Sequence, residues 1–141
     1  MTRFAWQDEY SVRDAELDAQ HRQLLAIMNE LAAEIERGEA LRRDVADHLF
    51  GKLAGYVMSH FAFEEQRMID SGVPAEQVKA HRHAHDGLIR QVQALQAEVE
   101  RGERNLADVL PFLYGDWLIS HICTVDHDYV PYLQAAAPAA G

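Results

Sequence analysis

Four segments of the chain repeat apolar residues in alternating steps of four and three, and Gly, Pro or Asn separates one segment from the next. This spacing places the apolar side chains on one face of an α-helix. An alternating Val, Ile and Thr run with hairpin turns, which would indicate strands, is absent from the sequence. Helices joined by short connections pack as antiparallel neighbours. We therefore predict an all-α, antiparallel, up-down-up-down four-helix bundle.

The bundle is expected to occupy about residues 14–130 of a single domain that spans 1–141. An N-terminal arm, residues 1–13, precedes it and is expected to pack along the bundle through its aromatic residues Phe4, Trp6 and Tyr10. The tail, residues 134–141, consists mostly of Ala and Pro and is expected to be frayed.

Residues that favour helix ends lie close to the predicted boundaries. Either Asp14 or Asp18 could cap the first helix, and Gly38 lies just past its expected end. Asn105 could cap the last helix, but Pro111 would then fall inside that helix. We therefore expect a short turn first, followed by a main helix that tolerates Pro111 in its first turn.

The charge balance disfavours two classes of partner. The chain has 23 acidic and 13 basic residues and a formal net charge of −10. Nucleic acids and anionic membrane surfaces attract clustered Lys and Arg, so we expect neither as a partner. The single cysteine, Cys123, excludes an internal disulfide and fits a reducing compartment. The sequence begins without a signal-like apolar run and has no stretch of membrane-spanning length, so we expect a soluble, cytoplasmic protein.

Histidine occurs on the apolar face of each predicted helix, and one of these faces also carries a glutamate. These inward positions are His21, His60 with Glu64, His81 with His85, and His121. An unpaired polar group in such a place costs roughly 1–3 kcal/mol. One core histidine is usually satisfied by a hydrogen bond, but five histidines on four inward faces indicate a shared metal site. Imidazole and carboxylate without thiolate suit iron, and also zinc, copper or manganese.

The remaining candidates are distinguished by their positions along the helices. Asp126 lies five residues after His121, about 140° around an ideal helix. Spacing alone therefore leaves two interpretations open, a further ligand or a solvated carboxylate near a helix end. His83 lies two residues from a histidine on either side and points away from the face that those two share. We expect His83, and likewise His48 and His127, to lie on the surface.

The order of these motifs is similar to that of the hemerythrin family. The motifs are D-x2-H ending at His21, H-x3-E from His60, H-x3-H from His81, and W-L-x2-H-I-x3-D from Trp117. The N-terminal FAWQDEYSV and the HF-x2-EE-x2-M run resemble the single-domain bacterial branch of that family. The resemblance extends from about Trp6 to Tyr132.

The resemblance implies a cofactor of two non-haem iron ions joined by an oxo or hydroxo bridge. One iron would be bound by His81, His85 and His121, and the other by His21 and His60. Glu64 and Asp126 would bridge the two. Counting ligands then leaves one coordination position open, on the iron with two histidines. The function implied is reversible O2 binding, for carriage, storage or sensing.

The resemblance also implies an apolar wall around the bound O2. Matched to the family's pattern, this wall is formed by Leu24, Phe61, Trp117, Leu118 and Ile122. The same side chains would be core residues in any such bundle, and the two roles are compatible. A dry pocket slows the entry of water and protons, and hence the oxidation of the iron to its inert diferric form.

Two other functions could use the same residues. One is a peroxidase, an oxidase, or a scavenger of nitric oxide or peroxide, and the other is an iron-handling protein with metal as its cargo. The histidine-rich ligand set argues against an enzyme, because di-iron oxygenases use about four carboxylates and two histidines. We expect a binding protein, with at most weak oxidase or peroxidase side activity. A separate O2-consuming protein could receive the O2.

Overall fold

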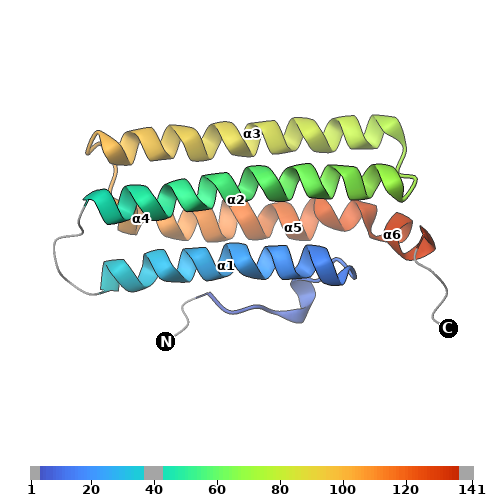
Figure 1. Ribbon diagram of the computed structural model, residues 1–141, viewed down its shortest axis with the longest axis horizontal. Coiled ribbons are helices and arrows are strands. Elements are labelled where there is room, and N and C mark those ends of the chain that lie inside the picture. The colour runs from blue at the N-terminus through green and yellow to red at the C-terminus, as the bar shows by residue number, and fades with distance from the viewer. Residues whose placement is uncertain (1–3, 37–42, 137–141) are drawn as a thin grey trace.

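The structure is a computed structural model that describes residues 4–36 and 43–136, with side chains described at 4–36 and 48–135. Helices α1 (Ala15–Glu36), α2 (Arg43–Asp70) and α3 (Ala75–Glu100) lie side by side, each antiparallel to the one before it (Figure 1). A fourth helical stretch, from Leu106 to Ala136, completes the bundle. The described ranges contain no strand. The predicted all-α four-helix bundle is confirmed.

The first helix begins at Ala15 because Asp14 caps it. One carboxylate oxygen of Asp14 accepts hydrogen bonds from the backbone N–H groups of Glu16 and Leu17, each at 3.1 Å. Asp18, the other predicted cap, instead binds the arm, through Ser11 Oγ at 2.6 Å and the Val12 N–H at 2.9 Å. The predicted stop at Gly38 lies outside the described residues.

Two glycines let the chain reverse between helices. Gly72 follows α2 with φ of 83°, and Gly102 follows α3 with φ of 75°. Both angles lie in the left-handed region that glycine adopts without steric cost, and this is a common end to a helix. The N–H of Glu103 then bonds back to the carbonyl of Glu98 at 2.9 Å, which closes α3. The turn at Gly72 places α2 and α3 side by side, as Figure 1 shows, and the turn at Gly102 leads into the fourth stretch.

The fourth stretch is irregular, and it corrects the prediction made for Pro111. Helix α4 (Leu106–Phe112) begins directly after Asn105, so Pro111 lies in its second turn and not in a first turn. A proline removes one N–H from the helix ladder. The chain then winds as a π-helix over Leu113–Ile119 and returns to α-helix in α5 (Ser120–Thr124). Helical winding therefore continues through the proline with altered pitch.

Beyond α5 the chain winds as a 3-10 helix over Asp126–Tyr129 and then as α6 (Val130–Ala136). Helix α6 extends three residues into the segment expected to be frayed, 134–141. Alanine has the highest helix propensity of all residues, which explains this extension. Residues 137–141 lie outside the described residues.

The N-terminal arm packs along the bundle as predicted, from Phe4 onward. The backbone N–H and carbonyl of Phe4 both bond to the side chain of Asn29 on α1, at 2.8 and 2.9 Å. A short 3-10 helix, Asp8–Tyr10, ends in a buried tyrosine whose hydroxyl lies 2.6 Å from that of Tyr114. The arm therefore links α1 to the π-helical segment.

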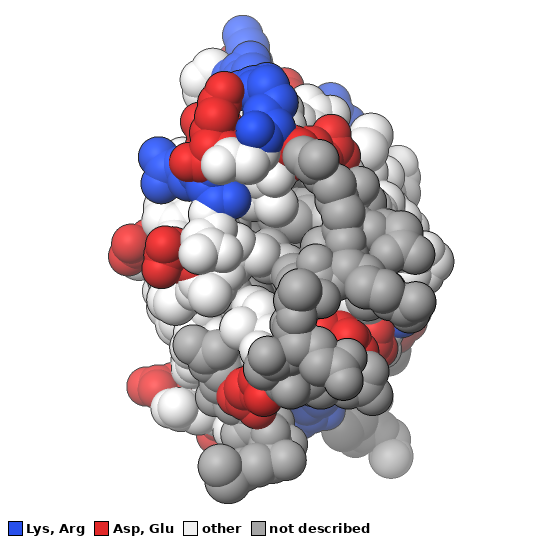
Figure 2. Space-filling view, turned by 90° about the vertical axis from the view of Figure 1, so that its left-hand side faces the viewer, with Lys and Arg blue, Asp and Glu red and all other residues white. Residues whose placement is uncertain are grey.

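The surface at one end of the bundle mixes charges of both signs. Figure 2 shows blue and red side chains interspersed at the end where α3 finishes. Two of the pairs there are Arg101 with Glu103 and Arg104 with Glu98, each at 2.9 Å. Within the described ranges, no helix is both long enough and apolar enough to span a bilayer.

Candidate metal centre

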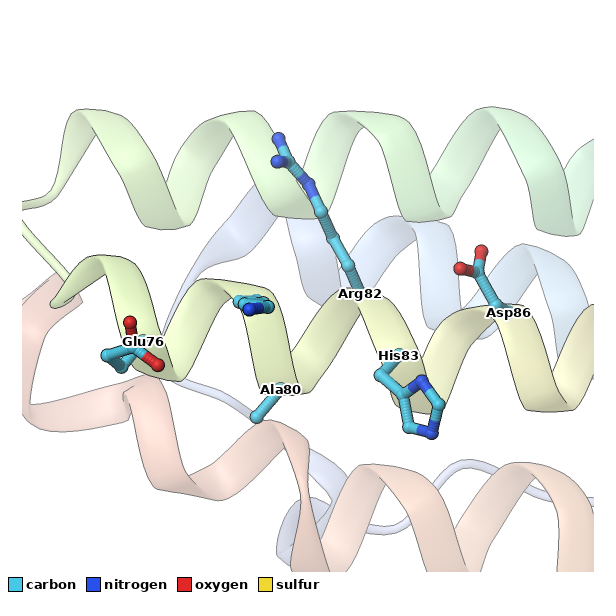
Figure 3. Close-up of a pocket in the computed structure, with 6 residues that line it drawn as sticks. Glu76, Ala80, Arg82, His83 and Asp86 are labelled. Atoms are coloured by element: carbon cyan, nitrogen blue, oxygen red, sulfur yellow. The ribbon is translucent and has the colours of Figure 1, made fainter.

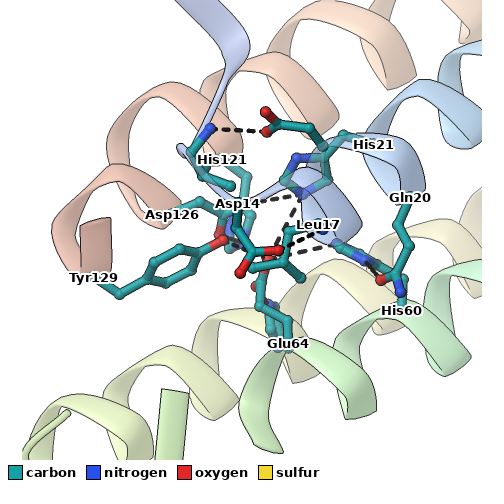
Figure 4. Close-up of polar contacts among 12 residues, drawn as sticks. Asp14, Leu17, Gln20, His21, His60, Glu64, His121, Asp126 and Tyr129 are labelled. Carbon is teal, nitrogen blue, oxygen red and sulfur yellow. Dashed lines mark hydrogen bonds and ion pairs between the residues drawn. The ribbon is translucent and has the colours of Figure 1, made fainter. Parts of the chain in front are cut away.

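All seven predicted ligands meet inside the bundle, nearer the end where α1 begins and α2 finishes, and Figure 4 shows part of this cluster. Each is at most 8% exposed, which is unusual for side chains of this polarity. One comes from α1, two from α2, two from α3 and two from the fourth stretch: His21, His60, Glu64, His81, His85, His121 and Asp126. The 4-residue spacings on α2 and α3 place two side chains on one face of each helix.

Three of the histidines gather on one side of the two carboxylates. His81 Nε2 and His85 Nε2 lie 2.8 and 2.9 Å from Glu64 Oε1. His81 Nε2 and His121 Nε2 lie 3.2 and 2.8 Å from Asp126 Oδ1. One oxygen of each carboxylate, Oε1 and Oδ1, therefore faces this three-histidine group.

The other two histidines face the opposite oxygens of the same carboxylates. His21 Nε2 lies 3.6 Å from Glu64 Oε2 and 3.4 Å from Asp126 Oδ2. His60 Nε2 lies 3.5 Å from Glu64 Oε2. Each carboxylate thus lies between a group of three imidazoles and a group of two.

Asp126, which spacing alone left open, points into the cluster. It is 1% exposed, so the alternative of a solvated carboxylate is wrong. Between His121 and Asp126 the winding changes from α-helix to 3-10 helix. The angle of about 140° that an ideal α-helix would place between His121 and Asp126 therefore does not apply here.

Several of these buried atoms fit a cation better than they fit one another. Nε2 of His121 and Oδ1 of Asp126 are 2.8 Å apart, yet neither makes a hydrogen bond within the part of the chain described. The same holds for Nε2 of His21 and for Oδ2 of Asp126. Buried polar atoms are rarely left without hydrogen bonds unless another partner takes their lone pairs. Atoms that converge without bonding to each other suit a metal ion between them.

The histidines around the two carboxylates counteract the effect of burial on the carboxylate pKa values. Burial alone would raise the pKa of Glu64, but the nearby imidazoles of His21, His81 and His85 hold this pKa well below its usual value. The pKa of Asp126 is likewise low: burial and the nearby Glu64 would raise it, but His121 and His21 outweigh them. Both carboxylates are therefore ionised and available to a cation.

The histidines of the cluster respond to those carboxylates unequally. Burial would lower the pKa of His21 and of His81, but the nearby carboxylates of Asp126 and Glu64 raise each to about 9. Burial dominates at His60 and lowers its pKa to about 4. Protons on His21 and His81 thus balance the carboxylates in the metal-free protein, and a metal must displace them to bind.

Three residues around the cluster were not predicted from the sequence. Gln20 Oε1 lies 2.6 Å from Nδ1 of His60, and Glu65 Oε2 lies 3.3 Å from Nδ1 of His85. Tyr129 donates a hydrogen bond to Glu64 Oε2 at 2.9 Å (Figure 4). Such outer partners orient the ligands of metal sites. The sequence offered only one sign of a role for Gln20 and Glu65, which is that each is next to a ligand. Many surface residues are also next to a ligand, so this sign was not sufficient.

The five residues predicted to form the apolar wall are all buried, at most 5% exposed: Leu24, Phe61, Trp117, Leu118 and Ile122. The ring of Phe61 stacks on that of His85, with centroids 3.8 Å apart and planes 3° from parallel. Trp117 donates from Nε1 to the carbonyl of Leu88 at 3.0 Å, which fixes the indole. Their contact with O2 stays a prediction.

The three histidines expected on the surface behave differently. His48 and His83 are exposed, as predicted. His127 is half-buried, and its Nε2 is shielded from solvent, so that prediction is wrong. The 3-10 winding from Asp126 onward turns this position partly inward, because the helical face is no longer the one that an α-helix would present.

Comparisons with known proteins agree with this geometry. The sequence profile of the hemerythrin HHE cation binding domain matches residues 13–133. The bacteriohemerythrin of Stenotrophomonas maltophilia is 29% identical over 135 residues, which cover 96% of this chain and 84% of that protein. The bacteriohemerythrin of Pseudomonas aeruginosa strain PAO1 is 32% identical over 131 residues, covering 92% and 81%. A crystal structure of a hemerythrin variant matches with a TM-score of 0.79 and 29% identity, covering 94% of this chain and 98% of that one.

The fold and the buried cluster together define a metal-binding four-helix bundle of the kind that carries non-haem iron. The chain belongs to the hemerythrin family. Proteins of this family bind O2 and are not enzymes, and the histidine and carboxylate cluster fits that function. The alternative of an enzyme on the same site is therefore not favoured.

Proposed function

We propose that this chain binds O2 reversibly at two iron ions. His81, His85 and His121 hold one ion, and His21 and His60 hold the other. Glu64 and Asp126 would bridge the two ions, together with an oxo or hydroxo group. The observation that supports this assignment is the division of the carboxylate oxygens, with Oε1 and Oδ1 facing three imidazoles and Oε2 and Oδ2 facing two.

The unequal number of histidines gives the two ions different roles. His81, His85 and His121 would give one ion three imidazoles, whereas His21 and His60 would give the other only two. The ion held by His21 and His60 would therefore keep a position for a small ligand. When iron is bound, the pair of ions supplies two electrons to O2 and recovers them on release.

The chain's own residues set the conditions for that exchange. Two Fe(II) ions, two carboxylates and one hydroxide would leave a net charge of +1, a small charge to bury. Neutral imidazoles favour the ferrous state more than additional carboxylates would, and this favours release. Phe61, Leu118 and Ile122 exclude water from the region of the open position, which limits irreversible oxidation.

The physiological role that we propose is carriage, storage or sensing of O2 in the cytoplasm, with an O2-consuming protein as recipient. The lone cysteine, which forms no internal disulfide, supports a reducing compartment. The acidic net charge of −10 disfavours nucleic acids and anionic membranes as partners.

Anaerobic titration with Fe(II), followed by O2 uptake, tests the proposal. We expect the metal-free protein to bind two Fe(II) per chain and the loaded protein to take up one O2 per two irons. Asp126→Ala should reduce iron binding below two per chain, because one bridge is lost. One iron per chain in the wild-type protein, or O2 uptake independent of loaded iron, would contradict the two-iron assignment.

A further inference from the structure

Two residues next to metal ligands each reach across to a histidine on the following helix. Gln20, which precedes His21 on α1, contacts Nδ1 of His60 on α2 at 2.6 Å. Glu65, which follows Glu64 on α2, contacts Nδ1 of His85 on α3 at 3.3 Å. Each contact therefore connects adjacent helices at the level of the cluster. Figure 4 shows Gln20 directed at His60, on the side of that ring away from Glu64.

The direction of these hydrogen bonds follows from which ring nitrogen faces the carboxylates. In both His60 and His85, Nε2 faces Glu64, so Nε2 is the nitrogen available to a metal. A neutral imidazole that binds a metal through Nε2 carries its proton on Nδ1 and must donate it. Amide and carboxylate oxygens both accept that proton, so both contacts hold the ring in the ligating orientation.

The two acceptors differ in charge. Gln20 offers a neutral amide oxygen, whereas Glu65 offers a carboxylate. The carboxylate is also paired with Arg82, whose Nε lies 2.8 Å from Glu65 Oε1. Arg82 is one of the residues that line a pocket of about 500 Å³, and Figure 3 shows its side chain leaning from α3 towards the neighbouring helix, whereas Ala80 and His83 point the other way. This guanidinium, 54% exposed, offsets the cost of keeping a charge at Glu65.

We propose that Gln20 and Glu65 are positioning residues that give the two halves of the metal centre different electrostatic surroundings. An anionic acceptor makes an imidazole a stronger donor and favours the higher charge on its metal. Glu65 therefore favours the ferric state in the three-histidine half. Gln20 holds His60 in place without that effect, and the two-histidine half, which carries the open position, is more readily returned to the ferrous state. This inference rests on the proposed two-iron site.

The positioning role is tested by binding of Co(II) to metal-free variants, followed by the visible spectrum of the bound Co(II). We expect Gln20→Ala to weaken one of two binding steps by about 10- to 100-fold and to leave the other unchanged. Gln20→Glu should restore that step, because a carboxylate accepts the same hydrogen bond. Gln23→Ala is the matched control: Gln23 lies on the exposed face of α1, and we expect wild-type binding from it.

The electrostatic role is tested by the reduction potential of the iron-loaded protein. We expect Gln20→Glu to lower the potential, because it adds a negative charge behind His60, and Glu65→Gln to raise it. Gln23→Glu adds the same charge at an exposed position of the same helix and should shift the potential much less. A packing role alone would not produce shifts of opposite sign.

The outcomes separate this inference from the proposed function. Two Co(II) per wild-type chain with unchanged affinity in Gln20→Ala would overturn the positioning role while leaving the two-metal site intact. Potentials that do not move, or that move in the same direction in both charge variants, would overturn the electrostatic role. Fewer than two Co(II) per wild-type chain would overturn the proposed centre and this inference together.

Discussion

Tyr129 donates a hydrogen bond to Glu64 Oε2 at 2.9 Å, and both side chains are fully buried. Oε2 is the oxygen that faces His21 and His60, so the phenol holds the carboxylate on the side of the proposed open position. Burial and the negative charges of Asp126 and Glu64 raise the pKa of this phenol, which therefore keeps its proton. In the metal-free protein this protonated donor stabilises Glu64 as an anion.

Removing that hydroxyl should destabilise the metal-free protein. We expect Tyr129→Phe to lower the free energy of unfolding by about 1.5–3 kcal/mol, because a hydrogen bond to a buried charged group is lost. Urea denaturation measures this. Tyr132→Phe, at a half-buried tyrosine three residues further on, should change stability by about 0.5 kcal/mol or less. Equal losses of unfolding free energy in the two variants would show that the hydrogen bond to Glu64 adds no stability beyond that of an ordinary tyrosine hydroxyl.

The apolar wall should control how fast the iron-loaded protein oxidises irreversibly. We expect Leu118→Ala to speed this autoxidation while iron content stays near two per chain, because water gains access to the centre. Trp117→Ala should act in the same direction. Autoxidation is followed by the optical spectrum in air.

Leu49→Ala is the control for a cavity made elsewhere. Leu49 is buried on α2 eleven residues before His60, about 16 Å along the helix. It should lower stability by about 2–5 kcal/mol, as other core leucines do, without changing autoxidation. Unchanged autoxidation in both wall variants would refute the assignment of the wall.

The stability of the metal-free protein should be greatest near pH 6.5. The pKa values of His21 and His81 are about 9 in the folded state, above the ordinary 6.5 of the unfolded state. Their contribution is therefore complete below pH 6.5 and is lost as pH rises to about 9. The pKa of His60 is about 4, so unfolding binds a proton as pH falls from 6.5, and stability is lost on that side as well.

Urea midpoints at several pH values between 4 and 9.5 measure this dependence. Iron-loaded protein should show a flatter profile, because these three imidazoles then hold metal and no longer titrate with folding. A metal-free profile that is flat from pH 6.5 to 9 would contradict the raised pKa values of His21 and His81.

Substitution by alanine should change the stability of the protein in opposite directions at two glycines. Gly102 has φ of 75°, so Gly102→Ala forces a strained backbone and should destabilise by about 1 kcal/mol. Gly55 lies on the exposed face of α2, and a Cβ there would meet no atom within 4 Å. Gly55→Ala should therefore stabilise by about 0.5–1 kcal/mol. Thermal unfolding of the two variants should show shifts of opposite sign.

The sequence was sufficient for the parts of the molecule that depend on regular helical geometry. The steps of four and three predicted the bundle and brought His60 with Glu64, and His81 with His85, onto inward faces. It was insufficient where the winding changes. The position of Asp126 and the half-burial of His127 follow from a 3-10 helix that periodicity does not predict.

Contacts between helices were a second limit of the sequence. Gln20 and Glu65 look like solvated polar residues on their own helices, and only the packing of α1 against α2 and of α2 against α3 brings them to their histidines. Pro111 was misplaced for a different reason. A proline marks a break in an isolated helix, but the fourth stretch continues through it by loosening into a π-helix.

Reversible O2 binding at the two-iron centre is tested most directly by the optical spectrum of anaerobically reduced, iron-loaded protein. The spectrum is recorded before air, after air, and again after sparging with argon. We predict near-ultraviolet and visible charge-transfer bands that appear with O2 and vanish under argon. Bands that appear once and do not reverse, or no bands despite two irons per chain, would contradict the account.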